Sequence, residues 1–107
     1  VSSVYIMQEL KILMDDVIFW QDNSTFPVRE IAVRLHHRLV FIHPFPNGNG
    51  RFSRLFADLY LINKDKPRFS WGKNNLVKDS VFRDQYLKAL RSADMGDYTK
   101  LIVFADS

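Results

Sequence analysis

Residues 43–54 read His-Pro-Phe-Pro-Asn-Gly-Asn-Gly-Arg-Phe-Ser-Arg, and they stand between two stretches with the apolar spacing of helices. Pro44 disfavours a helical conformation for the residue before it, so the upstream helix should end near His43. The glycine-rich run that follows favours a tight turn. From Arg51 the apolar spacing is helical again. This stretch therefore predicts a compact turn that leads directly into a new helix.

Two helices are expected before the turn. The first spans about Tyr5–Gln21, where apolar residues recur at intervals of three and four, and the turn formers at 22–25 end it. The second runs from about Pro27 to Ile42, since proline is favoured in a first helical turn. Its expected core stripe consists of Val28, Ile31, Leu35, Leu39 and Ile42.

Three helices are expected after the turn. They span about Arg51–Ile62, Asp79–Met95 and the short region around 101–104 that Asp97 can cap, with a loop over Arg68–Asn75. The expected inward positions are Phe52, Leu55, Phe56 and Leu59 in the first of these helices and Phe82, Tyr86, Ala89, Leu90 and Ala93 in the second, which Gly96 ends. Only Val1–Val4 reads as strand, so the predicted class is all-α.

The composition limits the possible classes of fold and function. The chain has 107 residues, 47% of them hydrophobic and 25% charged, which predicts one globular domain and no membrane span. The absence of cysteine excludes disulfides, zinc ribbons and thiol nucleophiles, and it suits a cytoplasmic protein. A formal net charge of +3 favours polyphosphates without identifying one.

The turn itself carries the candidate chemistry. Backbone N–H groups at a helix start lack intrahelical acceptors and favour an anion, and glycine lets the backbone approach a phosphate closely. Arg51 and Arg54 share a helix face and can hold the same anion. His43, just before the turn, is suited to accept a proton near neutral pH. The simpler alternative is an ordinary loop with solvated arginines, with His43 capping carbonyls or packing on Phe45.

Other polar residues have structural readings. His36 is seven residues, or about 10.5 Å of helix, from His43, so helix packing or exposure is favoured over a shared metal for His36 and His37. Trp71 can stack on a nucleobase or anchor a loop. Asp94 can pair with Arg91 and Asp58 with Arg54 through helical spacing, all within residues that the sequence places on two helices.

The stretch 43–54 resembles the signature of the Fic (Fido) family, H-x-F-x-[D/E]-G-N-G-R-x-x-R, at every defined position except the acidic one. Residues 69–72 and the pattern over 83–97 also resemble a bacterial subgroup labelled mobile mystery protein B. The resemblance implies that residues 1–107 form the C-terminal core portion of a Fic domain. Its fold would be a helical bundle with the active-site loop between two central helices. An upstream part would be missing, and Val1–Val4 would be a remnant of a β-hairpin flap.

The same resemblance implies an enzyme that transfers AMP from ATP to a Ser, Thr or Tyr hydroxyl of a target protein. His43 would be the general base and Phe45 would anchor the loop in the core. Asp94 would lie near the position at which relatives contact the nucleobase. The nucleotide-binding residues would be Gly48, Asn49, Gly50, Arg51 and Arg54. Gly50 favours adenylylation, because the kinases of this superfamily carry lysine there.

Asn47 departs from the family pattern, which has an acidic ligand for Mg²⁺ or Mn²⁺ at this position. A neutral amide offers one oxygen without charge, which implies weakened metal dependence. The alternatives are a catalytically weak nucleotide-binding regulatory module or the transfer of another phosphate-containing group. A nucleic-acid-binding helical domain ranks last, because the basic residues are spread along the chain.

Inhibition of the family commonly uses a helix with the pattern [S/T]-x-x-x-E-[G/N]. Neither Glu9 nor Glu30, the two glutamates here, lies in such a pattern. The resemblance therefore implies an inhibitory helix in a missing segment, a separate antitoxin-like protein, or no inhibition.

Overall fold

The computed structural model describes residues 3–73 and 78–107, and the described chain is built from helices alone. These helices are α1 (Ser3–Asp22), α2 (Val28–Ile42), α3 (Asn49–Asn63), α4 (Asp79–Asp94) and α5 (Thr99–Ala105). All five lie where the sequence predicts helices, with ends that differ by two residues or fewer for α1 to α4. The all-α class is confirmed.

The expected N-terminal strand is wrong for the part that is described. Ser3 and Val4 lie in the first turn of α1, and Val1 and Ser2 lie outside the described residues. A strand needs a neighbour for its backbone hydrogen bonds, and the described chain offers none. A helix satisfies these groups within the segment, so α1 simply extends upstream.

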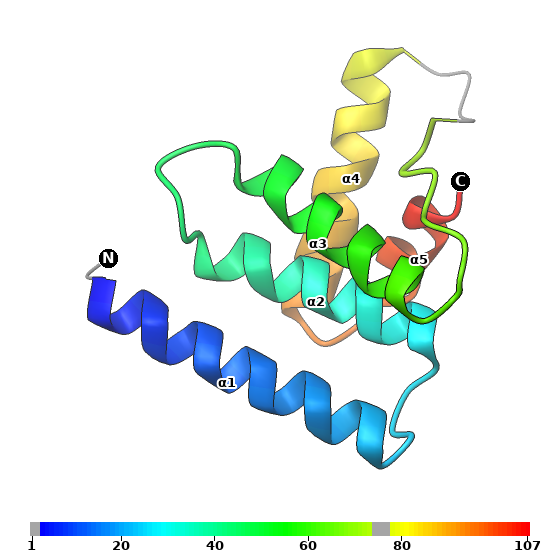
Figure 1. The fold of residues 1–107 in the computed structure, drawn as a ribbon. Helices are drawn as coiled ribbons and strands as arrows, with labels where there is room; N and C mark the ends of the chain where they lie inside the picture. The colour runs from blue at the N-terminus through cyan, green and yellow to red at the C-terminus, as the bar shows by residue number, and fades with distance from the viewer. Residues whose placement is uncertain (1–2, 74–77) are drawn as a thin grey trace.

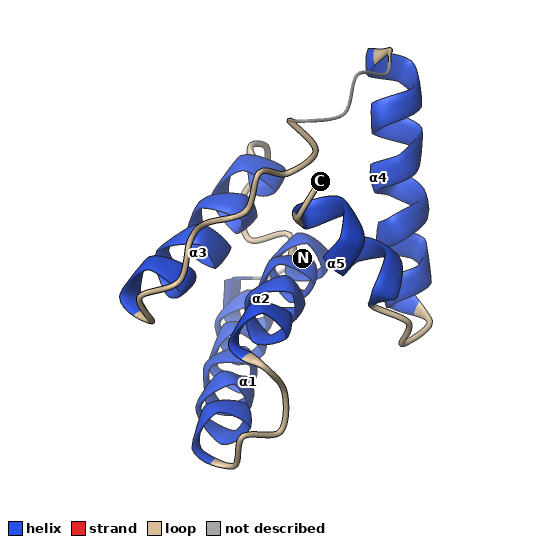
Figure 2. Ribbon diagram, turned by 90° about the vertical axis from the view of Figure 1, so that its right-hand side faces the viewer, coloured by secondary structure: helices blue, strands red, loops and turns tan. Residues whose placement is uncertain are grey.

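Helix α2 is the centre of the bundle. It contacts α1 on one side and α3 and α5 on the other, and α5 packs against α4 (Figures 1 and 2). The predicted stripe of α2 meets α1, in a cluster of Leu13, Val17, Ile31, Leu35, Leu39 and Ile42. A second face of α2 is also buried, and Ala32 and Val33 join a cluster with Ala57, Leu61, Phe69, Trp71, Ala89, Ala93, Leu101 and Ala105. Both faces of α2 therefore belong to the core.

The buried face of α3 differs from the one expected from the sequence. Its buried residues are Asn49, Ser53, Ala57 and Leu61, whereas Leu55, Phe56 and Leu59 are 41–54% exposed. Small side chains let two helix backbones approach closely, so α3 turns this narrow face toward α2. The larger apolar side chains are left on the outside.

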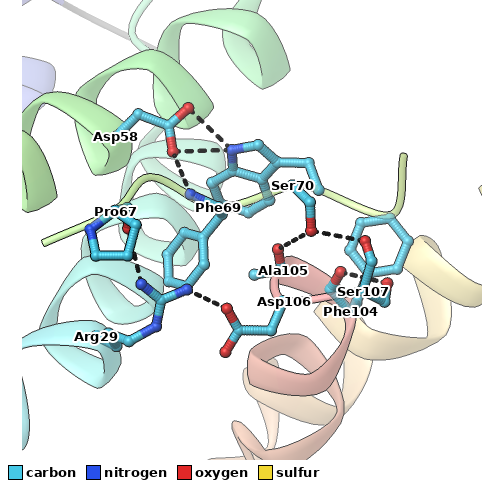
Figure 3. Close-up of polar contacts among 10 residues, drawn as sticks. Arg29, Asp58, Pro67, Phe69, Ser70, Phe104, Ala105, Asp106 and Ser107 are labelled. Carbon is cyan, nitrogen blue, oxygen red and sulfur yellow. Dashed lines mark hydrogen bonds and ion pairs between the residues drawn. The ribbon is translucent and has the colours of Figure 1, made fainter. Parts of the chain in front are cut away.

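The segment after α3 is fixed by side-chain hydrogen bonds. The Asp58 carboxylate accepts the Trp71 indole N–H at 3.1 Å and the Phe69 backbone N–H at 3.2 Å. Arg29 donates to the Pro67 carbonyl and pairs with Asp106, and Ser70 donates to the Ser107 carbonyl (Figure 3). These bonds hold residues 67–71 against α2, α3 and the residues that follow α5.

Two expectations about this segment are thereby settled. Trp71 is a buried loop anchor, 8% exposed. Asp58 bonds with Trp71 and Phe69 instead of the predicted partner Arg54. Asn74 and Asn75, at the end of the expected loop, lie outside the described residues.

The C-terminal helices follow the sequence closely. Ala89 and Ala93 of α4 are buried, and Gly96 ends the helix with a positive φ of 90°. Asp97 accepts the backbone N–H of Thr99 at 3.0 Å, so it caps α5 as expected. Across residues 3–73 and 78–107, no helix is long and apolar enough to cross a membrane.

Candidate functional site

The turn between α2 and α3 begins at His43. This residue is the C-cap of α2, with φ 57° and ψ 59°, and its backbone N–H donates to the Leu39 carbonyl at 3.1 Å. The left-handed conformation is strained for a residue with a Cβ. Here it turns the chain sharply away from the helix axis. His43 is exposed at this bend, so its imidazole is accessible to a ligand.

The turn ends at Gly48, the N-cap of α3. Gly48 has a φ of 75°, a value that suits glycine, and its carbonyl accepts the first intrahelical bond of α3 from Phe52. The N–H groups of Asn49, Gly50 and Arg51 therefore lack intrahelical acceptors. The turn and the helix start together form a backbone arrangement suited to an anion.

Asn49 braces the turn from within. Its side chain is 6% exposed. The amide oxygen accepts the Phe45 backbone N–H at 3.0 Å, and the amide nitrogen donates to the Phe45 carbonyl at 2.7 Å. Both ends of the amide are occupied, which leaves the backbone N–H of Asn49 as its group for a ligand.

Phe45 does not enter the core as the resemblance implied. Its ring is 43% exposed and packs edge-on against Phe52, with ring centroids 4.7 Å apart. The turn is held by the Asn49 amide pairing with the Phe45 backbone, and the Phe45 ring adds a surface contact.

The two arginines of the motif differ in their surroundings. Arg51 is exposed, whereas Arg54 is half-buried. The Arg54 guanidinium lies over the start of α3, because a Cβ built on Gly50 would lie 3.7 and 3.9 Å from its two terminal nitrogens. Both arginines line a pocket of about 470 Å³, together with Leu55, Asp58, Trp71, Lys73, Phe82 and Phe104. Three cations against one carboxylate, which is already bonded to Trp71, favour an anionic ligand in this pocket.

A buried histidine lies behind Arg54. His36 is fully buried, its Nε2 is 2.9 Å from the Tyr86 hydroxyl, and its ring is 4.7 Å from that of Trp71. Burial, followed by the Arg54 charge, lowers the His36 pKa from 6.5 to about 3. Burial raises the Tyr86 pKa, against the opposing effect of a hydrogen bond and charge from Arg54. Sequence reasoning missed this connection, because nothing in the helical spacing joins α2 to α4.

His37 is packed in the same way on the neighbouring position. Its Nε2 is 2.8 Å from the Asp94 carboxylate, and its Nδ1 is 3.4 Å from the Tyr98 hydroxyl. Asp94 thus pairs with His37 instead of the predicted Arg91. The packing interpretation of His36 and His37 is confirmed.

A metal would find few ligands here. Residues 3–73 and 78–107 contain no cluster of three or more His, Cys, Asp or Glu side chains able to hold an ion. Asn47 is exposed in the turn and offers one neutral carbonyl oxygen. Mg²⁺ prefers carboxylates and phosphates, so these protein residues alone do not fit a resident metal.

The fold and the site define a helical bundle with an anion-suited glycine turn between its two central helices, bounded by a histidine and two arginines. The Fic/DOC family pattern matches residues 2–61. The chain belongs to this family.

Similar proteins and a similar solved structure support this family assignment. The chain is 33% identical over 100 residues to "Protein adenylyltransferase fic-1" of Caenorhabditis elegans, covering 91% of this chain and 18% of the relative. It is 36% identical over 100 residues to "Protein adenylyltransferase Fic" of Drosophila mojavensis, covering 90% and 18%. The solved structure of C. elegans Fic-1 superposes with a TM-score of 0.71 at 28% identity, covering 99% of this chain and 29% of that one. The chain therefore spans about a fifth of the length of these curated relatives.

Proposed function

We propose that this chain carries the catalytic core of a protein adenylyltransferase, which transfers AMP from ATP to a Ser, Thr or Tyr hydroxyl of a target protein. The observation that carries the proposal is the geometry of one turn. An exposed histidine begins it, and the open start of α3 with two arginines ends it. The relatives named as protein adenylyltransferases support the choice of reaction.

The residues divide the reaction between them. The backbone N–H groups of Asn49, Gly50 and Arg51, with Gly48 shaping the turn, hold the phosphates of ATP. Arg51 and Arg54 hold the outer phosphates through charge-assisted hydrogen bonds. Their positive charge stabilises the negative charge that grows on the leaving group.

His43 acts as the general base. The target hydroxyl oxygen attacks the α-phosphorus, a new phosphorus–oxygen bond forms to the target, and the bond to the β-phosphate oxygen breaks. The hydroxyl proton passes to the His43 imidazole, and pyrophosphate leaves. The exposed position of His43 in the bend gives a protein substrate access to it.

Mg²⁺ or Mn²⁺ would be bound mainly by the phosphates of the nucleotide. Asn47 would add one amide oxygen to an ion that ATP phosphates already hold, so metal dependence would be weaker than with a carboxylate. We further propose a cytoplasmic setting and control by an antitoxin-like protein or an inhibitory helix outside these residues. Glu30 is paired with Arg34 at 2.9 Å within α2, so it is not available for that task.

Labelled ATP tests the proposal. The full-length protein is incubated in a lysate with Mg²⁺ or Mn²⁺ and ATP labelled at the α- or the γ-phosphate. Relative to the lysate alone, we expect new protein bands labelled from the α-phosphate only, and no new bands with His43→Ala or His43→Asn. Asparagine tolerates the left-handed conformation, so His43→Asn removes the base and keeps the bend. New bands from γ-labelled ATP, or new α-labelled bands that survive both variants, contradict the proposal.

A nucleotide-binding regulatory module is the second candidate, and the neutral Asn47 favours it. ATP binding by calorimetry without labelled bands supports this module or the transfer of another phosphate-containing group.

A further inference from the structure

We propose that Tyr86 and His36 are positioning residues that hold the Arg54 guanidinium over the start of α3, through a chain of hydrogen bonds with one fixed direction. The inference rests on the proposed function, because it concerns the arginine that would hold the outer phosphates of ATP. It assigns a role to two residues outside the motif.

The contacts place Tyr86 between a cation and a buried ring. Arg54 approaches Tyr86 with its guanidinium carbon 6.0 Å from the ring centroid. The Arg54 charge and donor groups lower the Tyr86 pKa against the effect of burial, so they act on the hydroxyl. The same hydroxyl lies 2.9 Å from His36 Nε2. The guanidinium also lies close to Gly50, since a Cβ built there would be 3.7 Å from its nearer terminal nitrogen. Arg54 is thus confined between α4 and the N-terminal turn of α3.

Donor chemistry fixes the direction of the chain. A guanidinium only donates hydrogen bonds, so in the proposed chain of bonds the Tyr86 oxygen accepts from Arg54. The Tyr86 proton is then available for His36 Nε2, which must accept it with a lone pair. His36 is therefore neutral, with its proton on Nδ1. A protonated His36 would direct a second donor at the Tyr86 oxygen and place a positive charge near Arg54.

The packing keeps this arrangement rigid. The His36 ring is buried against Trp71, which is itself held by the Asp58 carboxylate. His36 Nδ1 has no hydrogen-bond partner among the described residues. The Ser53 backbone raises the His36 pKa, as an acceptor near a ring N–H would. Rotating the ring would thus gain no better partner and would leave Tyr86 without its acceptor.

Nucleotide affinities in the full-length protein test the role of Tyr86. Tyr86→Phe removes the hydroxyl and keeps the ring. Tyr98→Phe is the matched control. The Tyr98 hydroxyl contacts the neighbouring buried His37 at 3.4 Å, and it takes no part in the hydrogen bonds proposed for Arg54. We expect Tyr86→Phe to weaken ATP binding about tenfold and AMP binding less than about twofold, and Tyr98→Phe to change neither. Equal loss for ATP and AMP, or no loss, overturns the proposal.

Substitution of His36 tests the acceptor. His36→Gln supplies an amide oxygen that can accept the Tyr86 proton, and His36→Leu supplies none. We expect His36→Gln to keep most of the ATP affinity and His36→Leu to lose as much as Tyr86→Phe. Similar ATP affinities for the two variants would overturn the proposed chain of hydrogen bonds. If His36→Leu does not fold, the Tyr86→Phe and Tyr98→Phe pair still decides the question.

The tautomer of His36 supplies a readout independent of catalysis. Long-range ¹H–¹⁵N NMR of the imidazole should show the proton on Nδ1 in the wild-type protein, with or without ATP. A proton on Nε2 overturns the proposal. A protein that binds no ATP and labels no target refutes the proposed function alone, because this measurement then still tests the hydrogen-bond chain.

Discussion

The Asp58 carboxylate lies 3.1 Å from the indole nitrogen of Trp71 through each of its oxygens, and one of them also accepts the Phe69 backbone N–H. This contact joins α3 to the segment that follows it. It also satisfies the carboxylate without Arg54, which leaves that arginine for the pocket and for Tyr86. Asp58 thereby fixes Trp71 in the lining of the pocket and leaves the Arg54 guanidinium unpaired with Asp58.

Asp58→Ala should destabilise the protein by about 2–3 kcal/mol, because it leaves two donors near the core unpaired. Denaturant unfolding followed by tryptophan fluorescence measures the effect. Asp84→Ala is the control, since Asp84 forms an exposed pair with Lys88 and should cost less than about 0.5 kcal/mol. Equal costs for the two variants would show that the Trp71 contact contributes nothing.

Gly72→Ala should be far more damaging than Gly96→Ala. Both glycines have a positive φ, 78° and 90°, so alanine is strained at each by about 1 kcal/mol. Only at Gly72 would the new Cβ meet another group, the Phe82 ring at 2.4 Å, and that ring packs on Phe104. We expect a total loss of about 3 kcal/mol at Gly72. Thermal melting distinguishes the two cases, and matching melting temperatures would contradict the steric argument.

Acid should destabilise the fold through His36. Its pKa is 6.5 when unfolded and about 3 when folded, so the unfolded chain binds an extra proton between these values. The stabilisation is fully present above pH 6.5 and is lost as the pH falls, by up to about 1.4 kcal/mol per pH unit. Urea unfolding between pH 7 and 5 measures the slope. His36→Gln, which cannot titrate, should show a shallower slope, and an unchanged slope would assign the effect elsewhere.

Asn47→Asp should strengthen metal dependence. A carboxylate in the exposed turn supplies the charge that Mg²⁺ prefers, so labelling from ATP at low Mg²⁺ should rise about tenfold. Asn63→Asp, which adds the same charge at the far end of α3, serves as the control and should change nothing. Labelling that is unaltered by Asn47→Asp would remove this position from the metal site.

The helices and the turn follow from local features of the amino-acid sequence. Apolar residues at helical spacing, the prolines at 27 and 44 and the glycines at 48 and 96 are local signals, and they act within a few residues of where they stand. The motif over residues 43–54 is likewise contiguous. Its histidine, glycines and arginines could therefore be chosen as candidate site residues before any packing was known.

The buried helix faces and the pairing of the polar groups depend on long-range packing, which local sequence features do not reveal. Periodicity shows which residues share a face, but it does not show how many neighbours a helix has. Because α2 has neighbours on both sides, His36 joins the core beside the predicted stripe. Because α3 packs through Ser53 and Ala57, its larger apolar residues stay outside. The partners of Asp58 and Tyr86 come from other elements of the chain, and only long-range packing brings them together.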